Sequence, residues 1–209
     1  MILDPADLSH QEVYKLLNGS VVPRPIAFVS TLSARGERNL APFSFFNVVC
    51  SSPAAVSFSV MRRGDTAQKK DTLLNIEETR EFVVNVVTEA IAAQVNQASA
   101  DYPRGVDEFV EAGFTPRPSL VVAPPGVAES PVSMECRLIQ IVHLGDGPGA
   151  GSLVIGRVER FHVSDEVYDR GRIDPAKLQA VGRMAGAAYT RTQDTFDLIR
   201  PTLARVTPG

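Results

Sequence analysis

Short runs rich in β-branched and aromatic residues recur along this chain and outnumber the segments with helical patterns. Six of them are predicted to be strands, at residues 26–32, 43–50, 54–61, 81–87, 132–144 and 152–163. In the third run, apolar residues at 56, 58 and 60 alternate with serine or methionine, as in a strand with one buried face. Because these runs cluster and short turns join them, the sequence favours a mainly β fold, a barrel or sandwich with added helices.

Helical additions are predicted around residues 9–18, 71–112 and 175–181. Ser9 and Glu12 form a capping box for the first, and Asp71 is expected to cap a helix over residues 71–79. Further helices are expected at 88–98 and 106–112. The glycine-rich stretch 145–151 resembles a dinucleotide-binding fingerprint, but that motif needs a helix after it. Here a strand is predicted instead, so the stretch is interpreted as a hairpin loop.

Composition excludes several classes of protein. The 209 residues carry a formal net charge of -3, with 44% hydrophobic and 22% charged residues. This balance is that of a globular protein rather than a disordered or globally basic one, so no nucleic-acid partner is expected. No apolar run approaches the roughly 18 residues needed to span a membrane, and no signal peptide is recognisable at the start. We therefore expect a single cytoplasmic domain over residues 1–209 with no membrane partner.

The residues that most often build reactive centres are few and scattered. Three histidines do not group with cysteines or carboxylates at metal-ligand spacing, so no metal is expected. Cys50 and Cys136 are expected to be buried and reduced rather than bridged. There is neither a Gly-x-Ser-x-Gly elbow nor a Walker sequence. Acyl transfer and nucleotide triphosphate hydrolysis are therefore unsupported.

Two neighbouring segments indicate a ligand site. Residues 23–47 contain many small and neutral polar side chains, which suit a flat heteroaromatic ring held by hydrogen bonds. Arg62, Arg63, Lys69 and Lys70 then precede a predicted helix, and cations beside a helix N-terminus bind anions. Together these features suggest a mononucleotide cofactor. The alternative is that residues 26–31 form a core strand and residues 62–70 a solvated surface loop.

A resemblance supports the ligand interpretation. Five segments of the chain resemble the flavin reductase-like FMN-binding split-barrel family, and more narrowly its longer flavoredoxin-like branch. In order along the chain they are PRPIAFVST, NLAPFSFFN, KKDTLLNI, EFVVNVV and GRMAGAAYTRT. The resemblance implies a six-stranded Greek-key split β-barrel and a homodimer with flavin near the subunit interface. It further implies FMN as cofactor, NADH or NADPH as electron donor, and an oxygenase or redox acceptor protein as a possible partner.

The same resemblance assigns site residues by position. Contacts to the flavin ring and its side chain are implied for Arg24, Pro25, Ser30, Thr31, Asn39, Ala41, Pro42, Ser44, Phe45, Phe46 and Asn47. Lys70, Asp71 and Thr72 would lie at the phosphate, with either Arg62 or Arg63 assisting, and residues 182–189 would close over the ring. The short flavin reductases carry a histidine-rich turn that is lacking here. His162 is therefore interpreted as a strand histidine hydrogen-bonded within the barrel, and the alternative is that it faces the nicotinamide.

The implied activity is that of an NAD(P)H:flavin reductase, in which hydride passes from nicotinamide to N5 of the flavin. Direct transfer between stacked rings needs no nucleophile or strong acid, so no catalytic residue is assigned. One alternative is an FMN-binding electron-transfer protein that receives its electrons from another protein and does not oxidise NAD(P)H. Another is a barrel that has lost flavin and serves as an interaction scaffold.

Overall fold

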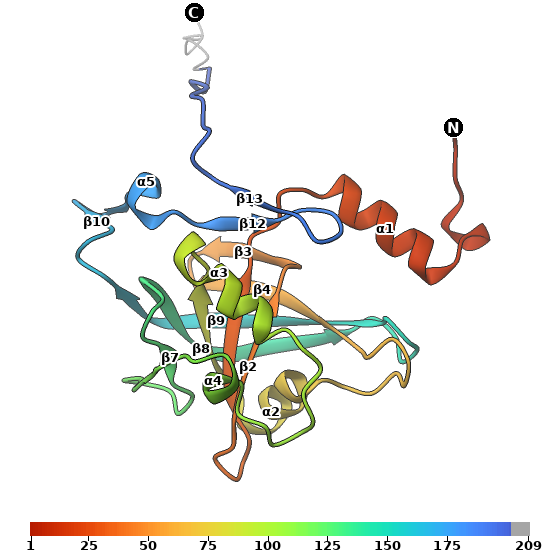
Figure 1. Cartoon of the computed structure of the whole chain (residues 1–209), viewed down its shortest axis with the longest axis horizontal. Coiled ribbons are helices and arrows are strands. Elements are labelled where there is room, and N and C mark those ends of the chain that lie inside the picture. Colours follow the sequence, from red (N-terminus) through yellow and green to blue (C-terminus); the bar gives the residue numbers. More distant parts are fainter. Residues whose placement is uncertain (202–209) are drawn as a thin grey trace, which may run out of the picture.

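In the computed structural model, which describes residues 1–201, the core is a seven-stranded antiparallel sheet (Figure 1). Its spatial order is β2-β1-β5-β8-β9-β4-β3. The bounds are β1 Ala27–Leu32, β2 Arg38–Phe43, β3 Phe46–Ser51, β4 Ala54–Met61, β5 Glu81–Val86, β8 Val132–His143 and β9 Gly151–Val163. Residues 202–209 of the predicted domain lie outside the described residues. The prediction of a mainly β fold with added helices is confirmed.

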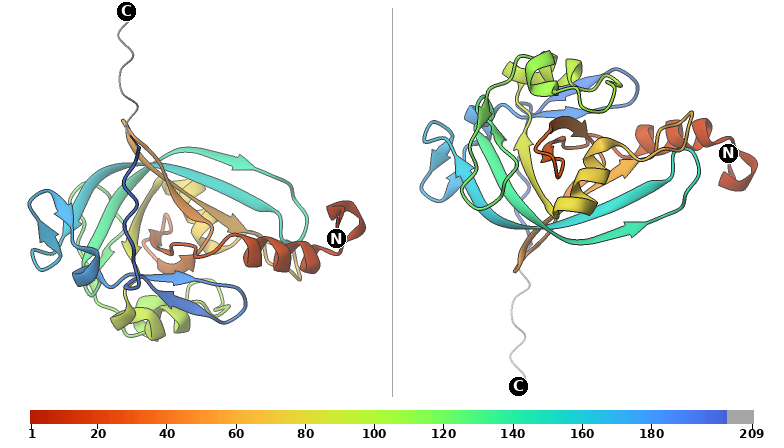
Figure 2. Two further views of the ribbon diagram at one scale, coloured as in Figure 1. Left: turned by 90° about the horizontal axis from the view of Figure 1, so that it is seen from above. Right: turned by 90° about the horizontal axis from the view of Figure 1, so that it is seen from below.

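The two edge strands of this sheet are consecutive in sequence. β2 ends at Phe43 and β3 begins at Phe46, so only Ser44 and Phe45 connect opposite edges. In a flat sheet, strands spaced by about 4.8 Å would put those edges nearly 30 Å apart. A connection this short spans only about 11 Å. The sheet must therefore curl until the end of β2 lies near the start of β3, and Figure 2 shows β8 and β9 bent into an arc around the shorter strands.

Seven strands replace the six that were expected, because the sequence patterns missed β2. Asn39 and Pro42 lower its intrinsic strand propensity. Pro42 is tolerated because β2 is an edge strand, where one side of the backbone needs no ladder partner. Pairing with β1, from Ala27 opposite Phe43 to Leu32 opposite Arg38, stabilises the strand. The predicted strand 43–50 is accordingly divided by the turn at Ser44–Phe45.

Two apolar clusters fill the interior. The first lies inside the curled sheet and centres on Phe58 and Phe82, whose ring centroids are 5.4 Å apart in an edge-on arrangement. The second packs Phe28 of β1 against Phe109 and Phe114, under the helical segment of residues 88–114. β1 is consequently covered on both of its faces and is buried along almost its whole length.

The helices partly match the predictions. α1 (His10–Ser20) has the predicted capping box, and α2 has the predicted bounds, Asp71–Thr79. The predicted cap of α2 is wrong, because the N-cap residue is Lys70 and no side chain caps the helix. The expected helix 88–98 is a 3-10 turn, η2 (Glu89–Ile91), followed by α3 (Ala92–Gln97). The expected helix 106–112 shortens to α4 (Glu108–Glu111), because Asp107 caps it.

The remaining elements are short. A 3-10 turn η1 (Pro5–Asp7) precedes α1, and α5 covers only Pro175–Leu178. Three small two-stranded sheets pair β6 (Pro116–Arg117) with β7 (Gly126–Val127), β10 (Tyr168–Asp169) with β11 (Arg172–Ile173), and β12 (Val181–Arg183) with β13 (Tyr189–Arg191). The stretch 145–151 is a hairpin loop between β8 and β9, as predicted.

Two further sequence predictions concern thiols and membranes. Cys50 and Cys136 are both free, but the expected burial is wrong for Cys50, which is exposed on the edge strand β3. Cys136 is buried in the first cluster, where burial raises the pKa of its thiol well above the usual range. Within residues 1–201, the helices are too short or too polar to cross a bilayer.

Gly156 of β9 provides a test of packing inside the sheet. A Cβ atom on Gly156 would lie 2.3 Å from Cζ of Phe82, a ring that is fully buried against Phe58. We expect Gly156→Ala to lower the free energy of unfolding by about 1–3 kcal/mol, because the ring has no room to move. Urea denaturation measures this. Gly19→Ala in α1 is the control, since nothing lies within 4 Å of its Cβ and alanine is the better helix former. Equal stability of the two variants would contradict the packing argument.

Candidate functional site

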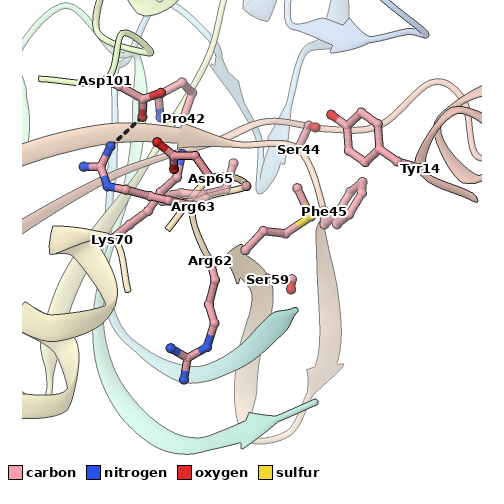
Figure 3. Close-up of a pocket in the computed structure, with 13 residues that line it drawn as sticks. Tyr14, Pro42, Ser44, Phe45, Ser59, Arg62, Arg63, Asp65, Lys70 and Asp101 are labelled. Carbon is pink, nitrogen blue, oxygen red and sulfur yellow. Dashed lines mark hydrogen bonds and ion pairs between the residues drawn. The ribbon is translucent and has the colours of Figure 1, made fainter. Parts of the chain in front are cut away.

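A cavity of about 710 Å³ opens beside the turn that joins the two sheet edges (Figure 3). This central cavity is formed by the end of β2, the end of β4, the loop 62–65 and the residue before α2. Its lining comprises Tyr14, Pro42, Phe43, Ser44, Phe45, Ser59, Met61, Arg62, Arg63, Gly64, Asp65, Lys70 and Asp101. The volume lies within the range of about 300–1,000 Å³ typical of small-molecule sites.

One end of the central cavity, the cationic end, holds Lys70 and Arg63 beside two carboxylates, those of Asp65 and Asp101 (Figure 3). Nη1 of Arg63 is 2.8 Å from Oδ1 of Asp101. Lys70 is also the N-cap of α2, whose first N–H groups have no side-chain acceptor. Free N–H groups at a helix N-terminus carry partial positive charge and attract anions. This end of the cavity can therefore bind a phosphate group.

The structure distinguishes the two neighbouring arginines. Both line the central cavity, but Arg63 also lines a second, smaller space that Lys70 shares. Arg62 directs its guanidinium away from Lys70, donating to the carbonyl of Ala67 at 2.9 Å and pairing with Asp146 at 3.0 Å (Figure 3). Of the two, Arg63 is placed to contact an anion at Lys70.

The opposite end of the cavity is aromatic and neutral. Tyr14 from α1, Ser44 and Phe45 from the edge turn, and Ser59 and Met61 from β4 gather there (Figure 3). The backbone N–H of Ser59 donates to the carbonyl of Phe45 at 2.8 Å, which holds the turn against β4. A flat ring can lie on such a surface, with hydroxyl groups at its edge.

A side arm of about 160 Å³ continues from the cationic end and shares Pro42, Phe43, Arg63, Lys70 and Asp101 with the central cavity. Four further predicted residues line this arm, namely Asn39, Ala41, Asp71 and Thr72. Nδ2 of Asn39 donates to Oγ1 of Thr72 at 2.9 Å, which ties β2 to the start of α2. The structure thus brings eight of the predicted site residues to one connected space, the eight being Asn39, Ala41, Pro42, Ser44, Phe45, Lys70, Asp71 and Thr72.

Arg24 lies behind the cavity rather than in its lining. Its guanidinium donates to the carbonyls of Asn18 and Val21 at the end of α1, both at 2.8 Å, and to that of Met184 at 3.0 Å. Its Nε lies 3.4 Å from Oγ of Ser44, and its Cζ lies 5.9 Å from the centroid of Phe45. Burial lowers the pKa of Arg24. Arg24 therefore connects α1, the β12–β13 hairpin and the turn that carries Ser44 and Phe45.

Five other predicted contacts lie apart from this space. Ser30 and Thr31 are fully buried and have internal partners: Ser30 donates to the carbonyl of Pro125, and Thr31 accepts from Asn75 at 3.0 Å. The side chain of Phe46 packs on the first apolar cluster. Pro25 and Asn47 are exposed. Their cofactor contacts remain predictions based on the resemblance.

Residues 182–189 belong to the β12–β13 hairpin, and of them Tyr189 lines a different, smaller cavity. That cavity, of about 380 Å³, lies between the hairpin and α3. Tyr189 packs under the guanidinium of Arg183, with Cζ 4.6 Å from the ring centroid. None of the residues 182–189 lines the central cavity, so the predicted closure over the ring remains a prediction.

His162 agrees with its interpretation as an internal strand histidine. Its Nε2 is hydrogen-bonded to Oε1 of Glu135, a fully buried carboxylate on β8. Burial by itself raises the pKa of Glu135, but hydrogen bonds from His162 and from the backbone N–H groups of Leu120 and Val121 outweigh it and lower the pKa. Glu135 and His162 therefore hold the loop 118–125.

The sequence patterns missed Tyr14, Ser59 and Met61, although a signal for two of them was present. The alternation along β4 buries Val56, Phe58 and Val60, so Ser59 and Met61 face away from that core. The alternation shows that Ser59 and Met61 share a face of β4, but it does not show which segments pack against that face. Tyr14 reaches the cavity only through the tertiary placement of α1.

No metal centre emerges in the part of the chain that the structure describes. Residues 1–201 contain no group of three or more histidine, cysteine, aspartate or glutamate side chains arranged to hold an ion.

Glu108 is an unusual buried acid at the side arm. Its side chain is almost wholly buried, and Oε2 accepts a hydrogen bond from the backbone N–H of Leu40 at 2.9 Å. The pKa of Glu108 is raised to about 7, mainly by burial; its hydrogen bonds to backbone N–H groups oppose the rise, and nearby Asp71 and Asp107 add to it. The carboxyl is therefore neutral in mildly acidic solution and becomes charged near neutrality.

The raised pKa predicts a pH-dependent stability. The pKa of Glu108 is higher in the folded protein than in the unfolded chain, so Glu108 contributes most to the free energy of unfolding below about pH 4.5. This contribution is lost as the pH rises through about 7. Between pH 5 and 8, we expect the free energy of unfolding of Glu108→Gln to rise by up to about 3 kcal/mol relative to that of wild type. Urea denaturation at several pH values measures this difference. Glu111→Gln, at an exposed site of the same helix, is the control. A difference that does not change with pH would refute the assignment.

Comparisons with known proteins agree with this geometry. A family model described as a flavin reductase like domain matches residues 19–177. An uncharacterized protein, BH2278 of Halalkalibacterium halodurans, is 42% identical over 207 residues, which cover 98% of this chain and 99% of the relative. Both matches extend over most of the chain, well beyond the segments around the cavity.

Solved structures are also similar. Nitrilotriacetate monooxygenase component B from Bacillus cereus is 38% identical with a TM-score of 0.90, covering 95% of this chain and 98% of the other. The 2-nitrobenzoate 2-nitroreductase NbaA of Pseudomonas fluorescens is 31% identical with a TM-score of 0.83, covering 100% and 99%. A Shewanella frigidimarina protein with a split barrel domain shares the fold at 23% identity and a TM-score of 0.79, covering 98% and 100%. The chain therefore belongs to the flavin reductase-like domain family.

Proposed function

We propose that this chain binds FMN in the central cavity and transfers electrons from NADH or NADPH to it. The observation that carries the proposal is the polarity of the cavity. Arg63, Lys70 and the uncapped start of α2 lie at one end, and the aromatic surface around Phe45 lies at the other. FMN has the same polarity, with a dianionic phosphate at one end and a flat ring system at the other.

Each end of the cavity has a distinct task. Lys70 and Arg63 pair with the phosphate, and the first N–H groups of α2 donate to it. Ser44 and Ser59 offer hydroxyl groups to the polar edge of the ring. Tyr14 and Phe45 pack against the ring without covering both of its faces. When bound, FMN supplies a ring that accepts a hydride at N5. The chain's part is to hold that ring and leave one face accessible to the nicotinamide.

Reduced flavin needs an acceptor. The similar Bacillus cereus protein is named as component B of a monooxygenase, which supports a partner oxygenase for this chain. The predicted homodimer is supported by the edge strand β3, where Val48 and Val49 remain 68% and 50% exposed. A second copy could cover this strand, because exposed sheet edges tend to pair.

Lys70→Ala tests the phosphate contact. Removing a charged partner of a phosphate costs about 1.5–3 kcal/mol, so we expect the Kd for FMN to rise at least about tenfold. Titration of flavin fluorescence measures the change. Lys177→Ala, at an exposed position of α5, is the matched control. Unchanged affinity in Lys70→Ala would mean that Lys70 is only a surface lysine.

Anaerobic mixing tests the electron source. We expect NADH or NADPH to bleach the visible absorption band of protein-bound FMN, because hydride transfer reduces the ring. The same mixture without protein gives the background rate. FMN that binds but is bleached by neither nucleotide would favour the electron-transfer alternative. A protein that does not bind FMN at all would refute the whole proposal.

A further inference from the structure

A second, apolar groove adjoins the aromatic end of the central cavity. It has a volume of about 600 Å³ and lies between α1 and the hairpin loop that joins β8 to β9. Tyr14, Phe45, Ser59 and Met61 line both spaces, so the groove opens onto the proposed ring site. Its other walls include Leu8, Val13 and Leu17 on one side and Leu144 on the other.

The glycine-rich loop 145–151 shapes this groove. A Cβ atom at Gly149 would lie 2.0 Å from Nε2 of His10, and one at Gly151 would lie 2.8 Å from Oγ of Ser59. Glycine at both positions thus lets the loop approach α1 and β4 closely. Both views of Figure 2 show the end of the β8–β9 hairpin beside α1. The loop therefore has a structural role that its resemblance to a dinucleotide motif did not reveal.

The chemistry of the lining limits what the groove can bind. Among the described residues that form it there is no lysine, arginine, aspartate or glutamate, and His10 and Tyr14 are the titratable side chains. A pyrophosphate would find no cation to pair with there. An uncharged planar molecule suits apolar walls and can lie against the ring site through the shared residues.

We propose that this groove binds an uncharged, planar aromatic electron acceptor of the quinone class, next to the flavin ring. This proposal rests on the proposed function, because it needs reduced FMN as the donor. The quinone takes up a hydride from N5 of reduced FMN and one proton from water. It leaves as the hydroquinone, and the flavin is reoxidised, so two electrons and two protons balance.

The first test uses the apoprotein, so it does not depend on turnover. The probe is 2,3-dimethyl-1,4-naphthoquinone, whose substituted quinone ring does not readily add to the exposed thiol of Cys50. In ¹⁵N-labelled protein we expect the amide resonances of Gly149, Gly151 and Leu144 to shift on titration. Those of Gly36 and Gly171, in turns that do not line the groove, should stay in place. No saturable shift at Gly149 and Gly151, up to the solubility limit, would overturn the proposal.

Two neighbouring leucines provide matched variants. Leu17 lines the groove and is 54% exposed, whereas Leu16 is 45% exposed and does not line it. Both are partly solvent-facing positions of α1, so their substitution should leave the fold intact. We expect Leu17→Gln to raise the Kd of the quinone at least about fivefold and Leu16→Gln to leave it unchanged. Equal effects of the two substitutions would overturn the assignment.

A second test separates this proposal from the proposed function. FMN-loaded protein, reduced with dithionite, is mixed anaerobically with the quinone. We expect the reoxidation rate to saturate with quinone concentration, and Leu17→Gln to raise the half-saturation point as it raises the Kd. A rate that stays linear in quinone while FMN binds normally would overturn only the acceptor site. Failure of FMN to shift the amides of Lys70 and Thr72 would overturn the proposed function and, with it, the redox role of the groove.

Discussion

The fold and the site both depend on one constraint, the two-residue connection between β2 and β3. These strands occupy opposite edges of a seven-stranded sheet, yet only Ser44 and Phe45 join them. A connection of that length forces the sheet to curl until the end of β2 lies near the start of β3. The hydrogen bond from Ser59 to Phe45 holds this seam between the two edges. The central cavity lies at the seam, so its lining depends on the curl of the sheet.

The seam also explains why the cavity has two chemically different ends. β2 carries Asn39, whose bond to Thr72 places the uncapped start of α2 at one end. The turn after β2 carries Ser44 and Phe45 to the other end, and buried Arg24 holds that turn against α1 and the β12–β13 hairpin. Charge and aromatic surface are thus separated along a single strand and the turn that follows it. α1 contributes to both the cavity and the apolar groove, because Tyr14 and Leu17 project from one side of it.

Much of the fold was accessible from local patterns, and the errors have physical causes. The alternation along β4 and the bounds of α2 follow from side-chain periodicity, which tertiary contacts only reinforce. β2 escaped prediction because Asn39 and Pro42 disfavour a strand, and pairing with β1 overrides that preference. The resemblance assigned Ser30 and Thr31 to the ligand, which stays a prediction. β1 is covered on both faces, and in the structure their hydroxyl groups are bonded to internal partners.

The sequence by itself determined the mainly β class, the concentration of cationic residues before α2, and the family of the chain. These depend on local periodicity, on the order of charged residues and on motifs that persist without knowledge of the fold. Only the tertiary structure decided that the guanidinium of Arg62 is engaged by Ala67 and Asp146 while Arg63 lies near Lys70, that Glu108 is buried beside the cavity, and that Tyr14, Ser59 and Met61 complete its aromatic end. Such placements depend on which distant segments come into contact when the sheet curls, and local sequence patterns do not specify those contacts.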